Sequence, residues 1–432
     1  MHTFIIIWFG QLISTIGSSM SGFALAVWAW EETGQATTFA LWGFFDLLPR
    51  IIITPFAGVI VDRCNRKYLM MVGDTVAVLT TIALLWLFLT KDLHIWHLYL
   101  TAAIAGAFIQ IQELAYSASI SLMVSQQQYV RVSSMRALSG RIAQILAPPL
   151  AGFLYYVIGF TGLALIDIIS FAVAIATLTL VSIPQPEPHS PASKAFSHPL
   201  RDFWEDLQFG WRYILEHSQL LALLIVTTLF WLSHDIGNYL YTPMILSRTN
   251  NDAKVLGMLA AAAGLGGMTG ATLMSLWGGP KRRIDGVLRG MIGAGVSKLV
   301  FGLGRVSQVW IPAQFCSSFH FPFLGSCNTA IWMSQVEPSI QGRVFATQSL
   351  MFQIAGAVAT LIAGPLADGI FEPLMMKGNR IANVLSNVVG SGPGAGIAIL
   401  YIISSVGLIA IGLAGYAIPG LQALFVRSNA KK

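Results

Sequence analysis

The stretch that decides the fold is GVIVDRCNRK, residues 58–67, which joins two long apolar segments, residues 37–61 and 68–89. Five of its ten residues are charged or carry an amide, in a chain in which only 10% of the residues are charged. Each flanking segment is long enough to cross about 30 Å of hydrocarbon as a helix. A short basic turn between two such segments is typical of a cytoplasmic hairpin. The stretch therefore predicts a polytopic membrane protein.

The composition of the whole chain supports this prediction. Of the 432 residues, 55% are hydrophobic. Soluble domains carry about 25% charged residues, so a charged fraction of 10% cannot cover a water-facing surface of this size. Because lipid offers the backbone no hydrogen-bond partners, each span is expected to be a helix. Twelve spans are expected, at residues 3–30, 37–61, 68–89, 96–122, 137–158, 161–183, 218–244, 253–277, 284–304, 308–333, 343–368 and 394–416.

The positive charges are distributed unevenly about these spans. With the N-terminus inside, 16 of the 25 Lys and Arg residues fall in cytoplasmic segments, six fall outside and three lie within spans. Cytoplasmic loops of membrane proteins carry an excess of Lys and Arg. We therefore expect both termini in the cytoplasm and the protein in the inner (cytoplasmic) membrane of the cell.

The longest cytoplasmic segment divides the spans six and six. It begins with the proline-rich stretch PQPEPHSPAS, which predicts an irregular linker. Further on, an apolar stripe at helical spacing opposes charged residues and predicts an amphipathic helix at the membrane surface. The stripe consists of Phe203, Leu207, Trp211, Ile214 and Leu215. The expected domains are an N-terminal six-helix bundle (1–183), a cytoplasmic linker with this helix (184–217) and a C-terminal six-helix bundle (218–432).

Short motifs recur in the two halves. APPLAG at residues 147–152 corresponds to AGPLAD at residues 363–368. The turn SLWGGPKRR, residues 275–283, stands where the second half should repeat the turn at residue 58. Two six-helix halves with corresponding motifs fit parallel repeats around a central path.

The pattern G-x-x-x-D-R-x-x-R-K of residues 58–67, between the second and third spans, resembles the loop motif of the major facilitator superfamily. Four stretches, one of which contains this loop, are similar to the exporter branch that includes macrolide efflux proteins and the enterobactin exporter. They are FIIIWFGQLISTIGSSMSGFALAVWAW (4–30), LLPRIIITPFAGVIVDRCNRK (47–67), SFAVA (170–174) and QGRVFA (341–346). The resemblance implies an all-α membrane protein with twelve transmembrane helices in two six-helix pseudo-symmetric bundles, the major facilitator fold. It also implies alternating access and the export of amphipathic compounds, driven by proton entry.

The resemblance also assigns a gating motif. In the family, the Asp of this loop pairs with a basic residue and faces a helix end from the other half. Carried over to this chain, the motif residues are Gly58, Asp62, Arg63, Arg66 and Lys67. Asp74, near the inner end of the third span, is expected to join them. The alternative is that the loop serves only as a basic topology anchor.

Charged residues inside the spans are candidates for proton coupling, because a charge at such depth costs about 3 kcal/mol unless it faces a cavity or a partner. Asp46 and Arg50 are one turn apart and can meet on one helix face. Glu113 and Arg141 can pair across neighbouring helices. Asp235 is a further candidate. For each carboxylate, a static pair or hydrogen bond is the alternative to a proton site.

Other residues are expected to line a substrate cavity. They are Gln11, Phe23, Trp231, His234, Phe319, His320 and Phe323. Pro322 removes a backbone donor and favours local opening beside His320. A buried His bonded to a carbonyl is the alternative there. Lys298 is expected to snorkel or to form a structural pair.

These features favour a secondary active exporter and not an enzyme. Its expected substrates are amphipathic small molecules of the drug, siderophore or secondary-metabolite type, and the expected mechanism is proton antiport with alternating access. A lysophospholipid or lipid flippase, and a membrane receptor or scaffold without turnover, are the alternatives. The sequence holds no P-loop pattern, no H-E-x-x-H and no zinc-type spacing, so we expect no cofactor, no metal and no nucleic-acid partner. The expected partners are the substrate, protons and the lipid bilayer, and a monomer is expected.

Overall fold

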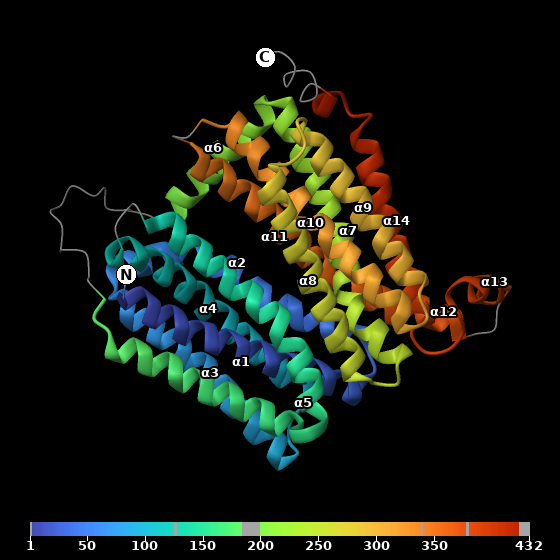
Figure 1. Ribbon diagram of the computed structural model, residues 1–432, viewed down its shortest axis with the longest axis horizontal. Helices are drawn as coiled ribbons and strands as arrows, with labels where there is room; N and C mark the ends of the chain where they lie inside the picture. Colours follow the sequence, from blue (N-terminus) through green and yellow to red (C-terminus); the bar gives the residue numbers. More distant parts are fainter. Residues whose placement is uncertain (1, 125–127, 184–198, 338–339, 377–379, 423–432) are drawn as a thin grey trace. The chain divides into compact units, whose positions relative to one another are not determined.

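The computed structural model describes residues 2–124, 128–183, 199–337, 340–376 and 380–422, which are almost entirely helical and contain no strand (Figure 1). Most helices are joined by short turns. The elements are α1 (His2–Thr33), α2 (Ala36–Arg63), α3 (Arg66–Thr90), α4 (Ile95–Met123), α5 (Tyr129–Leu180), α6 (Pro199–Glu216), α7 (Ser218–Arg248), α8 (Ala253–Trp277), α9 (Arg283–Leu303), α10 (Ser307–Gln335), α11 (Gln341–Leu366), η2 (Ala367–Phe371), α12 (Glu372–Met376), α13 (Arg380–Val389) and α14 (Ala395–Gly415).

Ten helices of the described ranges are long and apolar enough to cross a membrane. One of them, α5, is 52 residues long and is interrupted at Gly159, where φ is 62° and ψ is −170°. Only glycine adopts such a backbone readily, and the break falls between the predicted spans 137–158 and 161–183. α10, which is not among these ten, has 29 residues and covers the predicted span 308–333. Every predicted span thus coincides with a described helix, and the all-α membrane fold is confirmed, although the exact number of crossings stays a prediction.

By its internal contacts the chain divides into two compact units. Unit 1 comprises residues 1–29 and 42–204, and unit 2 comprises residues 30–41 and 205–432. The linker stretch from 184 to 198 lies outside the described residues. The domain boundaries drawn from the sequence at residues 183 and 218 therefore stay a prediction.

Unit 1 has two apolar clusters that are separated along α1 by a polar stretch. Phe4 and Ile7 belong to the first cluster, with Met70 of α3. The second cluster takes residues from Met20 onward, with Leu84 of α3. Between them α1 carries the polar residues from Gln11 to Ser19. The functional site described below lies at this level of unit 1.

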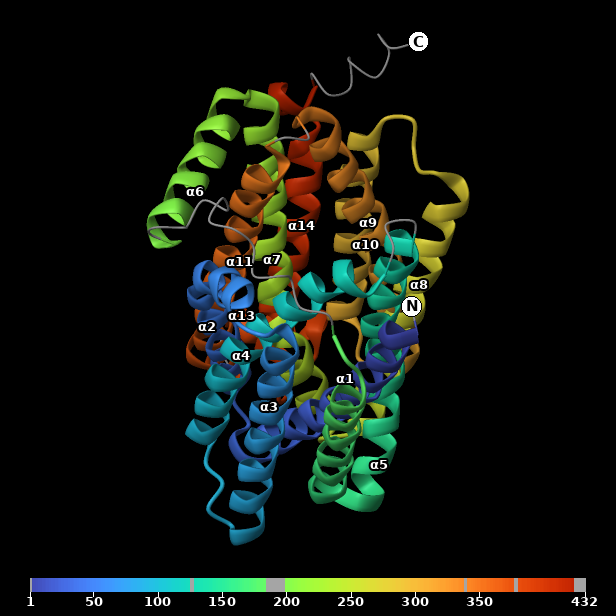
Figure 2. The same cartoon turned by 90° about the vertical axis from the view of Figure 1, so that its left-hand side faces the viewer.

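In unit 2, α10 packs against both α8 and α9, and α14 packs against α9 and α7 (Figures 1 and 2). Large buried side chains such as Phe230, Met291 and Trp332 form its core. Glycines permit the closest approaches: a Cβ added to Gly266 or Gly270 of α8 would collide with backbone atoms of α10.

The predicted amphipathic helix is present as α6, but its buried face differs from the predicted stripe. Leu207 and Ile214 are buried, whereas Trp211 and Leu215 are exposed. An ion pair of 2.9 Å between Asp206 and Arg343 of α11 accompanies this face. The side chain of Phe203 lies outside the described ones. The structure therefore buries Leu207 and Ile214 of the predicted stripe and leaves Trp211 and Leu215 exposed.

One contact is repeated in the two units, in agreement with the predicted sequence repeat. Arg66, the first residue of α3, donates to the carbonyl oxygen of Ala118 of α4 at 2.6 Å. Arg283, the first residue of α9, donates to the carbonyl oxygen of Ala330 of α10 at 2.8 Å. Each acceptor lies five residues before the end of its helix. A guanidinium group at this end of a helix is electrostatically favourable.

Two carboxylates that follow α11 cap helix starts within unit 2. Asp368 accepts hydrogen bonds from the backbone nitrogens of Ala36 and Thr37, at 3.0 and 2.7 Å, and from the Thr37 hydroxyl. Glu372 accepts from the backbone nitrogens of Gly394 and Ile397 at the start of α14. Both satisfy backbone donors that have no partner inside their own helix. Gly394 is the N-cap that precedes α14, with φ 79°.

Candidate functional site

A cavity of about 460 Å³ lies within unit 1. It combines apolar and aromatic surface with polar groups that converge from α1, α3, α4 and α5, as small-molecule sites do. The lining residues are Trp8, Gln11, Ser14, Thr15, Ser18, Ser19, Asp74, Ala77, Ile109, Gln112, Glu113, Tyr116, Arg136, Ser139, Gly140 and Phe171. The cavity contains Gln11, which was predicted to line it, and also Asp74 and Glu113, which were predicted for other roles.

The polar stripe on α1 forms one wall of this cavity. Gln11, Ser14, Thr15 and Ser18 occupy positions i, i+3, i+4 and i+7, so they share one face of the helix. The hydroxyl of Thr15 donates to the carbonyl oxygen of Gln11 at 2.7 Å, which satisfies it within the helix. Gln11 and Ser18 instead direct their side chains to neighbouring helices. Phe23, the other α1 candidate, packs against the second apolar cluster and does not line the cavity.

Asp74 is buried in the cavity wall, with 1% of its surface exposed. Gln11 of α1 donates to Asp74 Oδ2 at 2.9 Å, and Gln112 of α4 donates to Oδ1 at 2.6 Å. Two amide groups, each from a different helix, thus hold this carboxyl group. Its predicted contact with the loop motif stays a prediction, because the side chain of Asp62 lies outside the described ones.

Glu113 and Arg136 place charges of opposite sign on the same cavity. Glu113 is exposed to the cavity beside Gln112. The Arg136 guanidinium lies 4.9 Å from the centre of the Tyr116 ring, a cation–π distance. The predicted partner of Glu113, Arg141, has a side chain outside the described ones, so that pair stays a prediction. Arg136, which we did not select from the sequence, supplies a positive charge to the cavity.

The predicted pair of Asp46 and Arg50 is present on α2. Arg50 Nη2 lies 3.0 Å from Asp46 Oδ1, and both side chains are partly exposed. Close packing of α4 holds this part of α2, because Gly106 approaches the backbone carbonyl of Asp46. The contact confirms that the two side chains meet, and the choice between a static pair and a proton site stays a prediction.

The basic residues of the loop at residue 58 bind helix ends within unit 1. Arg66 contacts α4 as described above, and Lys67 Nζ donates to the carbonyl oxygens of Thr179 and Val181 at the end of α5. Asn65 caps the start of α3. These contacts hold three helices of one unit at the loop. The side chains of Asp62 and Arg63 lie outside the described ones, and the gating role of the motif remains a prediction.

The aromatic candidates of unit 2 fall into separate groups. The His234 ring lies 5.3 Å from Trp231 and 4.8 Å from Phe321 of α10, and its Nδ1 has no hydrogen-bond partner among the described residues. Phe319 and Phe323 lie 5.2 Å apart, and Phe323 contacts Trp277 of α8. The structure therefore brings Trp231 and His234 together with Phe321, and not with Phe319 or Phe323.

The side chain of His320 lies toward α9 and apart from the His234 group. Its Nδ1 lies 2.6 Å from the carbonyl oxygen of Cys316, and its ring lies against Gly293 of α9. The carbonyl contact of the alternative interpretation is therefore present, although His320 is partly exposed and not buried. The helix runs through Pro322 without a break.

Lys298 of α9 is buried and does not snorkel, since only 6% of its surface is exposed. Its Nζ lies 5.5 Å from the centre of the Tyr401 ring of α14. It also interacts electrostatically with Asp235 of α7. The second expectation for Lys298, a structural pair, fits this position.

Sequence reasoning missed Asp167, which lies in the second half of α5 and is 2% exposed. Ser18 donates to Asp167 Oδ1 at 3.0 Å, and Thr81 donates to Oδ2 at 2.9 Å. A signal was available, because Asp167 is the only charged residue in the long apolar run from Ile142 to Leu180.

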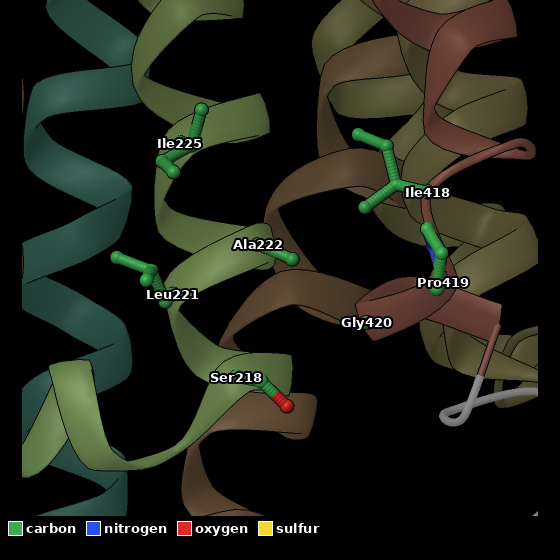
Figure 3. A pocket seen from close by; sticks show the side chains of 7 residues that line it. All are labelled: Ser218, Leu221, Ala222, Ile225, Ile418, Pro419 and Gly420. Atoms are coloured by element: carbon green, nitrogen blue, oxygen red, sulfur yellow. The ribbon is translucent and has the colours of Figure 1, made fainter.

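A second hollow, of about 490 Å³, is apolar and lies in unit 2 (Figure 3). Leu221, Ala222 and Ile225 of α7 form one side, and Ile418 and Pro419 the other (Figure 3). The described residues that line it include no charged group, and Ser218 is their only side-chain donor. The polar cavity of unit 1 is therefore the better candidate site.

A membrane-spanning bundle with a polar cavity and buried carboxyl groups defines a transporter, because such groups mark substrate and ion paths at membrane depth. The family model of the Major Facilitator Superfamily matches residues 7–360. The chain belongs to this superfamily, and it is a membrane transporter and not an enzyme.

Comparison with individual proteins agrees with the predicted resemblance. The chain is 24% identical to macrolide efflux protein A of Streptococcus pyogenes over 382 residues, which are 88% of this chain and 93% of that protein. A mutant of the nucleoside transporter NupG has a similar structure, with a TM-score of 0.69 and 11% identity over 98% of this chain and 100% of that chain. A bacterial homologue of the iron transporter ferroportin gives a TM-score of 0.67 and 13% identity over 95% and 98% of the two chains. At these identities the solved structures show a shared fold alone.

Proposed function

We propose that the protein exports amphipathic small molecules by alternating access, in exchange for protons. The observation that carries the proposal is the composition of the unit 1 cavity. Trp8, Tyr116 and Phe171 offer aromatic surface, while Glu113 and Arg136 offer charges of both signs. A guest with an apolar body and a polar or ionic group suits such a wall. The likeness to a macrolide efflux protein supports export as the direction.

Proton coupling requires a group whose charge changes during the cycle. Asp74 and Glu113 meet this requirement best, because they share the cavity with the proposed substrate. Asp74 has amide partners but no described ion pair. One of those partners, Gln112, is the residue before Glu113. A substrate that enters the cavity changes the hydration of both groups, and hydration is one of the factors that decide protonation. Asp235 in unit 2 remains a further candidate.

Transport by purified protein in liposomes tests the proposal. The probes are a radiolabelled macrolide and an amphipathic cationic dye, each followed with and without an imposed proton gradient. We expect movement of at least one probe that depends on the gradient and stops when a protonophore collapses it. An unchanged rate without the gradient would rule out proton antiport. Movement of a labelled lysophospholipid, with neither probe transported, would favour the flippase instead.

The proposed orientation places both termini in the cytoplasm. Cys64 is an exposed free thiol in the loop between α2 and α3 and serves as a natural reporter. With Cys316 and Cys327 replaced by Ser, a membrane-impermeant maleimide should label Cys64 in inverted vesicles but not in intact cells. The same protein with Cys64→Ser is the control. Labelling from outside intact cells would reverse the orientation and contradict the gating role of the loop.

A further inference from the structure

We propose that Asp167 is a second proton-binding site of unit 1, reached from the cavity through the hydroxyl group of Ser18. Asp167 does not line the cavity, whereas Ser18 does. The inference rests on the proposed proton-driven transport for its role in the cycle. The proton-binding itself can be measured without substrate.

The geometry places one carboxyl group among three helices. Asp167 lies eight residues after the break at Gly159, which corresponds to about 12 Å along the helix. Ser18 of α1 donates to Oδ1 and Thr81 of α3 donates to Oδ2, at 3.0 and 2.9 Å. Ser170, one turn further along α5, donates to the backbone carbonyl oxygen of Asp167 at 2.7 Å. Gly17 permits this approach, because a Cβ there would collide with Ser170.

The helices around Asp167 supply no positive charge at its level. α1 has no charged residue between His2 and Glu31, and α3 has only Asp74 after Lys67. α5 has no Lys, Arg or His after Arg141. The remaining titratable groups of neighbouring α4 are His97 and Glu113, with Tyr99 and Tyr116. An isolated carboxylate at this depth costs about 3 kcal/mol, so protonation of Asp167 removes an unfavourable buried charge.

The partners of Asp167 suit a group that gains and loses a proton. A hydroxyl group donates one hydrogen bond and also accepts. Ser18 and Thr81 can both donate to the carboxylate, and either can accept from the protonated acid. The same two contacts therefore persist in both protonation states, which backbone amides or an Arg would not allow.

The path from the cavity is one hydroxyl group long. An excess proton carried as hydronium in the cavity passes to Ser18 Oγ while Ser18 gives its own proton to Asp167 Oδ1, which leaves a neutral water molecule behind. The result is a neutral acid and an unchanged Ser18, and the reverse transfer restores the carboxylate. The arrangement repeats that of Asp74. Gln11 and Ser18 are two turns apart on α1, and Asp74 and Thr81 are two turns apart on α3. Asp74 accepts from Gln11, and Asp167 of α5 accepts from Ser18 and Thr81, so the levels of these two carboxyl groups differ by about 10 Å along α1 and α3.

Infrared difference spectroscopy of the full-length protein in lipid, recorded between high and low pH, tests the proposal. The carbonyl stretching band of a protonated carboxyl group should appear at low pH, and part of it should be lost in Asp167→Asn. Asp167→Glu should keep a shifted band, which guards against misfolding of the first variant. Ser18→Ala should slow hydrogen–deuterium exchange of this band. Ser19→Ala is the matched control, because Ser19 lines the cavity but donates only to the carbonyl oxygen of Thr15.

Three results would overturn the proposal. The first is a folded Asp167→Asn protein whose carboxyl bands are all the same as those of the wild type. The second is exchange that is as fast in Ser18→Ala as in Ser19→Ala, which removes the path through Ser18. The third is suppression of the band by Na⁺ but not by K⁺, which assigns the site to sodium. If liposome transport proves independent of protons, the proposed function fails while these spectra still decide the protonation of Asp167.

Discussion

Gln112 of α4 donates a hydrogen bond of 2.6 Å to Asp74 of α3, in the wall of the unit 1 cavity. Gln11 approaches the same carboxyl group from α1. Amide groups stabilise a carboxylate through hydrogen bonds but leave its net charge uncompensated. Asp74 is therefore held in place at a site where its charge stays available for exchange with protons.

We predict that Asp74→Asn removes the dependence of transport on the proton gradient. The variant keeps the size of the side chain and loses its charge change. Gradient-driven transport should fall by about tenfold or more, which corresponds to a loss of about 1.4 kcal/mol of coupling, while binding of the probe persists. The measurement is liposome transport over a range of pH, together with probe binding. Asp92→Asn, at an exposed acid just beyond α3, is the control, and gradient-driven transport retained in Asp74→Asn would exclude Asp74 as a coupling group.

A second prediction concerns the ion pair of α2. Asp46→Asn should leave Arg50 with an uncompensated charge inside a span, at a cost of about 3 kcal/mol, and lower the thermal unfolding midpoint in detergent. The double variant Asp46→Asn/Arg50→Gln should regain most of that loss and retain proton-driven transport, because both charges are removed together. Arg50→Gln alone measures the opposite half of the pair. Loss of coupling in the well-folded double variant would show instead that Asp46 carries a proton.

Much of the fold could be predicted because the signals are local in the chain. Length and apolar composition locate each membrane helix, and the charged turn at residues 58–67 predicts a hairpin between α2 and α3. The i, i+4 spacing was sufficient for Asp46 and Arg50 to be paired correctly. The polar face of α1 could likewise be found from its spacing, since Gln11 does line a cavity.

The site beyond α1 could not be assembled from the sequence, because the rotation of each helix depends on its neighbours. On α10, Phe319 and Phe323 share a face and were chosen together, but Phe321 is the residue that meets α7. Asp167 has partners 149 and 86 residues away on other helices. Nothing in a single sequence indicates which hydroxyl groups approach a lone acid. For Lys298, snorkelling to the membrane surface was one of two expectations. Its burial could not be predicted, because it depends on Tyr401, on a helix about a hundred residues further along.

A third prediction concerns Lys298. Replacing it with Met removes its electrostatic interaction with the partly buried Asp235 and should be destabilising, by less than the roughly 3–5 kcal/mol lost when one member of a buried, contacting ion pair is removed. The double variant Asp235→Asn/Lys298→Met should restore stability, because no unpaired charge remains. Expression level and thermal unfolding in detergent measure both. Lys254→Met, near the exposed start of α8, is the control. A Lys298→Met protein as stable as the wild type would show that the two charges do not depend on each other.

The last prediction concerns Asp368, whose carboxylate caps the start of α2. Asp368→Ala removes three hydrogen bonds and the favourable interaction of a negative charge with the helix N-terminus. The loss of such a cap costs about 0.5–2 kcal/mol, so the unfolding midpoint should fall modestly. Thr37→Val removes only the bond from the Thr37 hydroxyl and should cost less. Glu32→Gln, at an exposed acid in the same region, is the control.

The two variants also test whether the cap acts through the backbone. If it does, Asp368→Ala should be clearly less stable than Thr37→Val, because only Asp368→Ala loses the two backbone bonds. Backbone hydrogen exchange at Ala36 and Thr37 should rise in Asp368→Ala and stay close to the wild type in Thr37→Val. Equal exchange in the two variants would mean that the hydroxyl contact, and not the backbone contacts, holds the start of α2.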